Sequence, residues 1–307
     1  MFERLIYGLG LFVGSMTIGY ALGRVGVLTE PRAGIIMRAV MKWCSPVVLC
    51  LSFWPLELHR AEVLVLPVIG AALSVSTLIP AFGYARWARM TQAQTGAFLV
   101  CAMFSNLGFV GAFIAFALFG EEAYGLSTIY ILCFSPLFYA VGFGIAKRFG
   151  DGPHASSSAN LWTDELRFYP FAGLLVGLVL NLGRVPRPAA LQWLNHGLIP
   201  LNTAVYLATI GSQLHLESPG RWLKPSLAMS AIKFVYTPLI ASGLVWLLHL
   251  SELPRRVVLI HAAMPVAISP LMLSALFGLD RKLTSALFLF TTLAAIPWLF
   301  IYLPRIR

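Results

Sequence analysis

The stretch Gly10-Leu11-Phe12-Val13-Gly14 decides the fold, because a near copy of it, Gly173-Leu174-Leu175-Val176-Gly177, stands in the second half of the chain. Two further pairs of segments match at almost the same offset: Leu22-Gly23-Arg24-Val25 with Leu182-Gly183-Arg184-Val185, and Ser135-Pro136-Leu137-Phe138 with Ile296-Pro297-Trp298-Leu299. One match alone has little weight, but three at nearly one offset indicate that the two halves are related. We therefore predict an internal duplication.

The composition is that of a membrane protein. Of the 307 residues, 59% are hydrophobic and 11% are charged, whereas about a quarter of the residues of soluble domains are charged. A membrane-spanning helix needs about 20 mainly apolar residues, and ten segments are candidates, the sixth of them short: 5–23, 33–53, 63–85, 94–119, 124–146, 168–182, 197–216, 225–249, 256–276 and 282–303. They leave no room for a soluble domain. The sequence predicts an all-α integral membrane protein whose partner is the lipid bilayer.

The first of these segments has a second interpretation as a removable signal peptide, because Ala21-Leu22-Gly23 has the small residues of a cleavage site. Its apolar region is longer than a typical signal core, and the preceding Glu3-Arg4 is nearly neutral. The segment also carries the first copy of the duplicated motif. We therefore keep it as the first transmembrane span.

The net charge of +10 is spread over the ends of the predicted spans, which argues against a nucleic-acid partner. More Lys and Arg residues fall on the side that carries Arg24, Arg86 and Lys147 than on the side that carries Arg60 and Arg184. By the positive-inside rule, the first side is cytoplasmic. We expect a multi-pass protein of the cell (inner) membrane with both termini outside the cytoplasm.

The duplicated halves are predicted to have opposite orientations. Five spans per half is an odd number, so the second copy must enter the membrane inverted, as in the repeats of many transporters. Residues 147–167 form the one long polar stretch and contain Asp151-Gly152-Pro153, a composition that marks loops. We predict a first five-helix repeat over 1–146, a cytoplasmic linker over 147–167 and an inverted repeat over 168–307.

The glycine pairs Gly10 with Gly14 and Gly173 with Gly177 each lie on one helical face. Glycines at this spacing permit the backbones of two helices to approach closely. Packing within the bundle is the first interpretation, and the seam of a homodimer is the second. The sequence leaves both open.

Helix-breaking residues occur in matching spans of the two halves. Span four contains Ser105-Asn106-Leu107-Gly108-Phe109-Val110-Gly111, and the offset carries it onto Met264-Pro265-Val266-Ala267-Ile268-Ser269-Pro270 in span nine. Proline removes a backbone donor and clashes with the preceding turn, and non-helical backbone at membrane depth lines a cavity or is buried in protein. The amino termini of half-helices attract anions. We expect a substrate site at these breaks, with ordinary kinks as the alternative.

Lys233 is the charged residue to explain within span eight. It lies eight residues after Pro225, about 12 Å into the span at 1.5 Å per residue, where a charge is costly and usually has a partner or faces a cavity. No Asp or Glu lies deep in a predicted span. Lys233 could meet a substrate carboxylate or carry a coupling proton; alternatively it snorkels to a headgroup or satisfies the carboxyl end of a half-helix.

His261 precedes Pro265 by one helical turn and could couple transport to protons. Its position near the end of span nine equally suits an interfacial histidine. The lack of deep acidic residues weakens sodium coupling, although sodium also binds backbone carbonyls and amides. We expect no cofactor other than a coupling proton or sodium ion.

Cysteine and enzyme motifs give no catalytic interpretation. Cys44, Cys50, Cys101 and Cys133 lie inside predicted spans and form no CxxC pair, which is typical of buried thiols rather than a disulfide framework or metal site. The chain has no HExxH, GxSxG or Walker lysine. We expect no enzymatic activity.

Three segments resemble the auxin efflux carrier family of permeases, within the bile acid/auxin carrier superfamily. Residues 19–28, Gly-Tyr-Ala-Leu-Gly-Arg-Val-Gly-Val-Leu, resemble its opening. The break from Ser105 to Gly111 resembles its Asn-x-Gly-x-x-Gly element, and Ala263-Met264-Pro265-Val266-Ala267 resembles its Met-Pro element. Ala112-Phe113 replaces the Leu-Pro that often follows the first break, and Ser269 stands where Asn is common. These departures affect the predicted identity of the substrate more than they affect the predicted fold.

The resemblance covers residues 5 to 303. It implies ten helices in two inverted repeats with interrupted, crossing helices 4 and 9, scaffold helices 1, 2, 6 and 7, and transport helices 3–5 and 8–10. It also implies elevator-type transport of small organic anions such as malonate, malate or auxin-like acids. The substrate site would include Ser105, Asn106, Gly108, Pro265 and Ser269, with Lys233 nearby. A membrane-embedded ligand sensor and a sodium-coupled bile-acid-type symporter are the alternatives.

Overall fold

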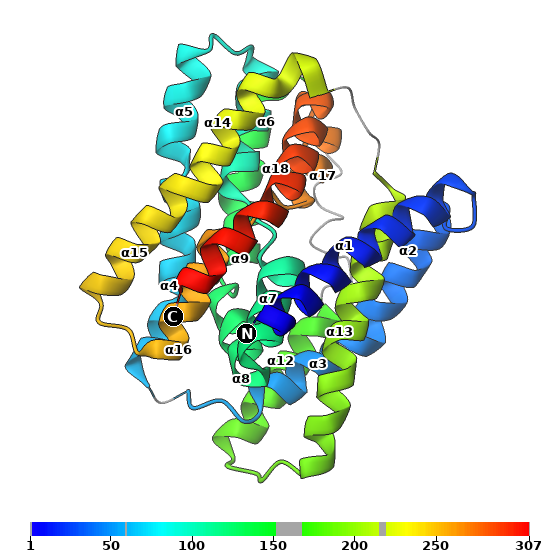
Figure 1. The fold of residues 1–307 in the computed structure, drawn as a ribbon, viewed down its shortest axis with the longest axis vertical. Helices are drawn as coiled ribbons and strands as arrows, with labels where there is room; N and C mark the ends of the chain where they lie inside the picture. The colour runs from blue at the N-terminus through cyan, green and yellow to red at the C-terminus, as the bar shows by residue number, and fades with distance from the viewer. Residues whose placement is uncertain (1, 59, 152–167, 215–218, 307) are drawn as a thin grey trace. The chain divides into compact units, whose positions relative to one another are not determined.

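A computed structural model describes residues 2–58, 60–151, 168–214 and 219–306 (Figure 1). Within these ranges the regular structure is helical, and β-pairing is limited to one isolated antiparallel bridge. The predicted all-α class is confirmed. The chain divides into two compact units, and each unit takes segments from both halves of the sequence.

The first unit comprises residues Met1–Arg60, Gly108–Thr128 and Ser157–Leu214. Its helices are α1 (Phe2–Arg24), α2 (Glu30–Ala39), η1 (Val40–Cys44), α3 (Ser45–Phe53), η2 (Leu107–Gly111, whose first residue belongs to the second unit), α7 (Ala112–Phe119), α8 (Glu121–Tyr130, whose last two residues belong to the second unit), α12 (Phe168–Leu182) and α13 (Ala189–Ser212).

The second unit comprises Ala61–Leu107, Ile129–Ser156 and His215–Arg307. Its helices in the first half are α4 (Ala61–Ser76), α5 (Leu78–Trp87), α6 (Gln92–Met103), α9 (Phe134–Leu137), η3 (Phe138–Gly142) and α10 (Phe143–Phe149). Those in the second half are η5 (Pro219–Trp222), α14 (Leu223–Ala231), η6 (Ile232–Tyr236), α15 (Thr237–Leu247), α16 (Glu252–Ala262), α17 (Ser269–Phe277), α18 (Arg281–Tyr302) and η7 (Leu303–Arg305).

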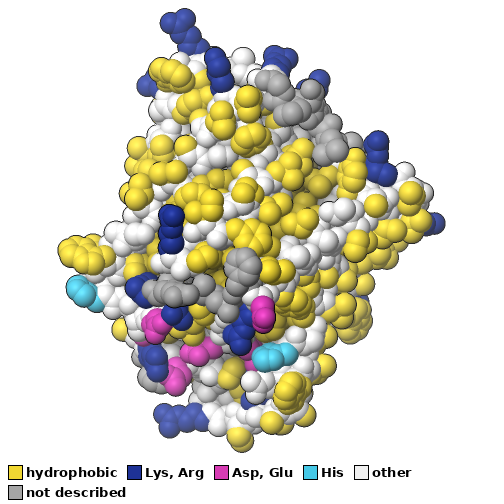
Figure 2. Space-filling model, in the orientation of Figure 1, with side chains coloured by type: hydrophobic (Ala, Val, Ile, Leu, Met, Phe, Trp, Pro, Cys, Tyr) yellow, Lys and Arg dark blue, Asp and Glu magenta, His cyan; other side chains and the backbone are white. Residues whose placement is uncertain are grey.

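In the part of the chain that the structure describes, six stretches of helix are long and apolar enough to cross a membrane: Glu3–Arg24, Glu30–Phe53, Ala61–Trp87, Glu121–Phe149, Leu223–Leu247 and Arg281–Arg305. The predicted spans four and nine fall short of this length because each is interrupted, and the sixth is the short helix α12. Hydrophobic side chains take up much of the surface visible in Figure 2. This exposure fits a surface that lies against lipid rather than water.

Close helix packing in the first unit depends on glycine. A Cβ atom at Gly173 would clash with the backbone of Pro46, and one at Gly177 would crowd Cys50, so this pair seats α12 against α3. Gly10 and Gly14, by contrast, meet nothing within 4 Å. One predicted glycine pair therefore packs within the unit, whereas the other leaves an open face on α1.

A buried ion pair ties three segments of the first unit together. Glu121 at the start of α8 accepts from both terminal nitrogens of Arg187, at 2.6 and 2.9 Å, and Arg187 also donates to the Leu51 carbonyl at 2.7 Å. Asn195 donates to the same carboxylate and to Ser52. The sequence did not predict this pair, because Glu121 lies in the short connection between predicted spans four and five, and Arg187 follows 66 residues later.

Candidate functional site

The first helix break follows α6. This helix starts with a capping box, in which Thr91 and Gln94 satisfy each other's backbone N–H groups, and it ends at Met103. Phe104 then adopts an extended conformation, with φ −102° and ψ 114°. The chain is non-helical up to Asn106 and resumes as the π-helical turn η2 at Leu107.

The second break lies between α16, which ends at Ala262, and α17, which begins at Ser269. Pro265 stands inside the break, where no helical donor is required of it. Pro270 occupies the first turn of α17, where the missing N–H would have no intrahelical partner anyway. The prolines thus fit the interruption, which lies where the sequence predicts it.

The two breaks pair with each other through their backbones. The Asn106 N–H donates to the Pro265 carbonyl at 2.8 Å, and the Ala267 N–H donates to the Phe104 carbonyl at 2.9 Å. These bonds flank the antiparallel bridge between Ser105 and Val266. Since buried backbone groups must find partners, each break supplies the hydrogen bonds that the other has lost.

A hydroxyl from α18 completes the pairing. The Val266 N–H donates to Thr291 Oγ1 at 3.2 Å, and Thr291 in turn donates to the Leu287 carbonyl at 2.8 Å. Thr291 is fully buried. Sequence reasoning missed Thr291, although a threonine inside an apolar helix of the second repeat is a signal that could have identified it.

Lys233 lies at the carboxyl end of α6. Its side chain is fully buried, and Nζ donates to the Ala102 carbonyl at 2.6 Å and to Ser105 Oγ at 2.8 Å. Thr77 donates to the same Ala102 carbonyl at 2.9 Å. A positive group is favourable at the negative end of a helix dipole. Lys233 thus satisfies the carboxyl end of a half-helix, which is one of the possibilities that the sequence left open. Its amine lies beside the first break.

A π-helical turn presents this lysine. Lys233 is the second residue of η6, which interrupts the regular helix between α14 and α15. Turns of this kind are rare and often occur at functional sites. An ammonium group has three donors, of which the described residues take two.

The remaining predicted residues of the breaks differ in their surroundings. Asn106 is buried, and its side-chain amide makes no hydrogen bond to a described residue. Ser269 Oγ is also buried without a partner among the described residues. Gly108 is exposed and begins the segment that belongs to the first unit. Within the described part of the chain, two polar side chains of the second unit thus make no side-chain hydrogen bond near the start of a helix.

His261 lies apart from the paired backbones, in the last turn of α16. It is 1% exposed, so it is a core residue rather than an interfacial one. Its Nδ1 lies 2.8 Å from the Val257 carbonyl, which makes Nδ1 the donor, and its ring contacts Tyr130 at 4.7 Å between centroids. Nε2 has no partner among the described residues.

Helix breaks that pair inside a bundle of apolar spans are typical of membrane transport proteins, and comparisons with known proteins agree. The model of a family described as membrane transport protein matches residues 153–303. A protein named "uncharacterized transporter" from Methanothermobacter thermautotrophicus is 25% identical over 91% of each chain, and another from Methanocaldococcus jannaschii is 26% identical over 90% of each. This match and these relatives confirm the resemblance to the auxin efflux carrier family.

Proposed function

We propose that the chain is a secondary transporter of small organic anions, and that the substrate binds at the paired helix breaks. The observation that carries the proposal is the position of Lys233. A fully buried amine beside two interrupted helices supplies a positive charge at Ser105, the residue before Asn106, and on the same unit as Ser269, whose buried hydroxyl has no partner among the described residues. A carboxylate is the group that such a set of donors suits best.

In this proposal, the substrate carboxylate takes the third donor of Lys233. Asn106 and Ser269 supply side-chain donors, and the Ser269 hydroxyl is buried without a partner among the described residues. Pro265 holds the break open, and Ser105 orients the amine through its 2.8 Å hydrogen bond. Gly108, two residues after Asn106, is exposed and has open space at its Cβ position. Substrates of the size of malonate, malate or auxin-like acids are the class to test.

The proposed mechanism is elevator-type alternating access by ten helices arranged as two inverted repeats. The predicted spans four and nine are the interrupted pair. The unit that contains Lys233 carries the substrate. Either Lys233 or His261 provides the proton that accompanies it. The protein would act in the cell membrane with both termini outside the cytoplasm.

Currents recorded from the purified protein on solid-supported membranes test this proposal. Malonate, malate, acetate and indole-3-acetate are added in turn, at fixed pH and with sodium present or absent. We expect a saturable current for at least one carboxylate, without a requirement for sodium. Lys224→Ala, a change of an exposed lysine on the same helical stretch, should retain the current, whereas Lys233→Ala should abolish it.

A further inference from the structure

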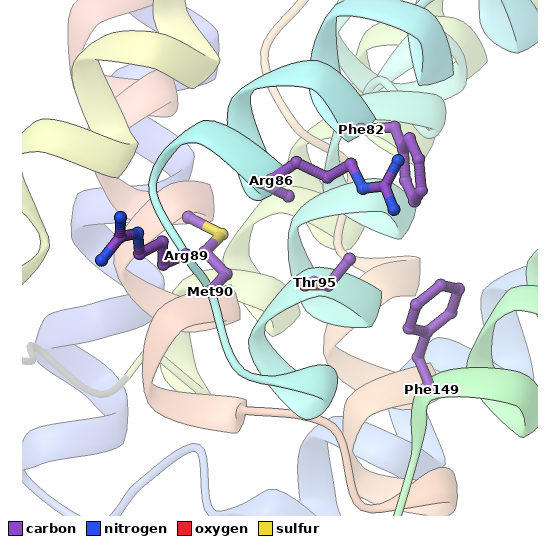
Figure 3. A pocket seen from close by; sticks show the side chains of 7 residues that line it. Phe82, Arg86, Arg89, Met90, Thr95 and Phe149 are labelled. Atoms are coloured by element: carbon purple, nitrogen blue, oxygen red, sulfur yellow. The ribbon is translucent and has the colours of Figure 1, made fainter.

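A recess in the second unit has no part in the proposed transport. It lies where α5 ends, α6 begins and α10 ends, and its volume is about 320 Å³. The residues that line it combine two arginines with a mainly apolar wall: Phe82, Ala85, Arg86, Arg89, Met90, Thr95 and Phe149. Figure 3 shows these side chains, with the guanidinium of Arg86 beside the ring of Phe82.

The charge of the recess is positive and unbalanced. Arg86 and Arg89 are both exposed, and neither forms an ion pair with a carboxylate of the described residues. The Arg86 guanidinium lies 5.2 Å from the centre of the Phe82 ring, a cation–π contact between two residues that line the recess. Arg89 directly follows the end of α5 in a left-handed conformation, with φ 51°. Both guanidinium groups are therefore free to bind an anion.

Further basic residues near the recess strengthen its preference for anions. Lys147 and Arg148 are exposed in the last turn of α10, beside Phe149. The nearby carboxylate of Asp280 is already engaged, since Oδ1 accepts from the Leu283 N–H and Oδ2 from Gln94. Asp280 is thus engaged away from the recess, and Asp151, exposed two residues after Phe149, forms no ion pair with Arg86 or Arg89 among the described residues.

The apolar residues around the recess indicate its depth in the membrane. The candidate span Ala61–Trp87 ends here. Trp87 is 79% exposed and Ile79 is 74% exposed, so this side of α5 faces lipid, and tryptophan is enriched where the hydrocarbon meets the headgroups. The recess therefore lies at the level of the lipid phosphates.

We propose that this recess binds the headgroup of an anionic phospholipid. A planar guanidinium group pairs with two phosphate oxygens in a forked geometry. The exposed side chains of Arg86 and Arg89 extend in different directions in Figure 3, so they would turn toward the recess to hold one phosphate together. Phe82, Ala85 and Phe149 offer an apolar wall to the glycerol and the first carbons of the acyl chains. Basic pockets between transmembrane helices on the cytoplasmic side recognise lipid headgroups in this way, and the positive-inside rule puts Arg86 on that side.

Thermal unfolding of the full chain in detergent tests the proposal. Phosphatidylglycerol should raise the Tm more than phosphatidylcholine at equal concentration. In Arg86→Gln/Arg89→Gln, the amount of phosphatidylglycerol needed for half of the shift should rise by roughly tenfold or more, since two charge-assisted hydrogen-bonding groups are lost. Arg221→Gln/Lys224→Gln removes two exposed charges at the same three-residue spacing, at the start of the α14 region, and should respond like the unchanged protein.

Two results would overturn the proposal. One is an equal response of both double variants to phosphatidylglycerol. The other is a shift of the same size from inorganic phosphate or glycerol 3-phosphate, which would identify a site for soluble anions instead. Should the glutamine variant not fold, Arg86→Lys/Arg89→Lys is tested instead. It keeps both positive charges but loses the bidentate hydrogen-bonding geometry of the guanidinium groups. Native mass spectrometry should then detect less bound phosphatidylglycerol on it than on the unchanged protein, and equal binding would contradict the role of the guanidinium groups.

Discussion

At the scale of single residues, Lys233 and Asn106 account for the chemistry of the proposed site. The depth of Lys233 in an apolar span was visible from the sequence, and so was the need for a partner. The partner itself was not, because the Ala102 carbonyl is a backbone group of a distant helix and has no signature in the sequence. The structure supplies it through an Nζ–O distance of 2.6 Å.

Replacing Lys233 with Met tests the role of the amine. The change keeps the length of the side chain but leaves Ser105 Oγ and the Ala102 carbonyl without that donor. We expect carboxylate flux in proteoliposomes to fall to background. The free energy of unfolding should fall by about 1–3 kcal/mol, the usual penalty for unpaired buried groups. Lys224→Met, on the exposed surface, serves as the control, and normal flux in Lys233→Met would contradict the proposed role.

Asn106→Ala tests whether the Asn106 side chain binds the substrate without a role in folding. The backbone N–H of Asn106, which bonds Pro265 at 2.8 Å, is retained in the variant, and the lost amide makes no hydrogen bond to a described residue. The Tm should therefore stay near that of the unchanged protein, while the KM for the transported carboxylate rises roughly tenfold, as expected for one lost hydrogen bond to a charged group. An unchanged KM would remove Asn106 from the site.

At the scale of elements, the paired breaks are the feature that the sequence predicted best. Asn106 with Gly108, and Pro265 with Pro270, interrupt helices by known local rules, so both positions were readable. The register was not readable, because the pairing of Ser105 with Val266 depends on how two distant segments meet. The hydroxyl of Thr291 was missed for the same reason.

Thr291→Val tests whether the second break depends on α18. The change is nearly isosteric but leaves the buried Val266 N–H without its acceptor, which should cost about 1–3 kcal/mol of unfolding free energy. Thr292 is the matched control, since its buried hydroxyl has no partner among the described residues. Thr292→Val should therefore be neutral or slightly stabilising in thermal unfolding. Equal effects of the two changes would show that the Thr291 bond is unimportant.

The buried ion pair of the first unit gives a second test of an element contact. Glu121→Gln leaves the Arg187 charge without a counterion, and breaking such a pair typically costs about 3–5 kcal/mol. Glu122 is exposed beside it, and Glu122→Gln should change stability by less than about 0.5 kcal/mol. Chemical denaturation of both variants measures the difference. A loss of similar size in both would assign the effect to net charge.

At the scale of the whole molecule, the chain resembles membrane transport proteins, and each of its compact units draws on both halves of the sequence. The apolar composition and the helical breaks were sufficient to predict the class and the family. Local patterns do not specify which segments group together, so the sequence could not reveal that residues 108–128 cluster with the first and last parts of the first unit. The identity of the transported anion depends on side-chain positions of the same non-local kind.

Radiolabelled uptake into proteoliposomes is the most direct test of the central claim that anions cross at the paired breaks. The carboxylate that gives the largest current is used, with the unchanged protein, Lys224→Ala and the triple variant Asn106→Ala/Lys233→Ala/Pro265→Ala. We predict saturable uptake in the first two and background uptake in the triple variant, with folding verified by its elution as a single species. Uptake by the folded triple variant at the rate of the unchanged protein would contradict the account.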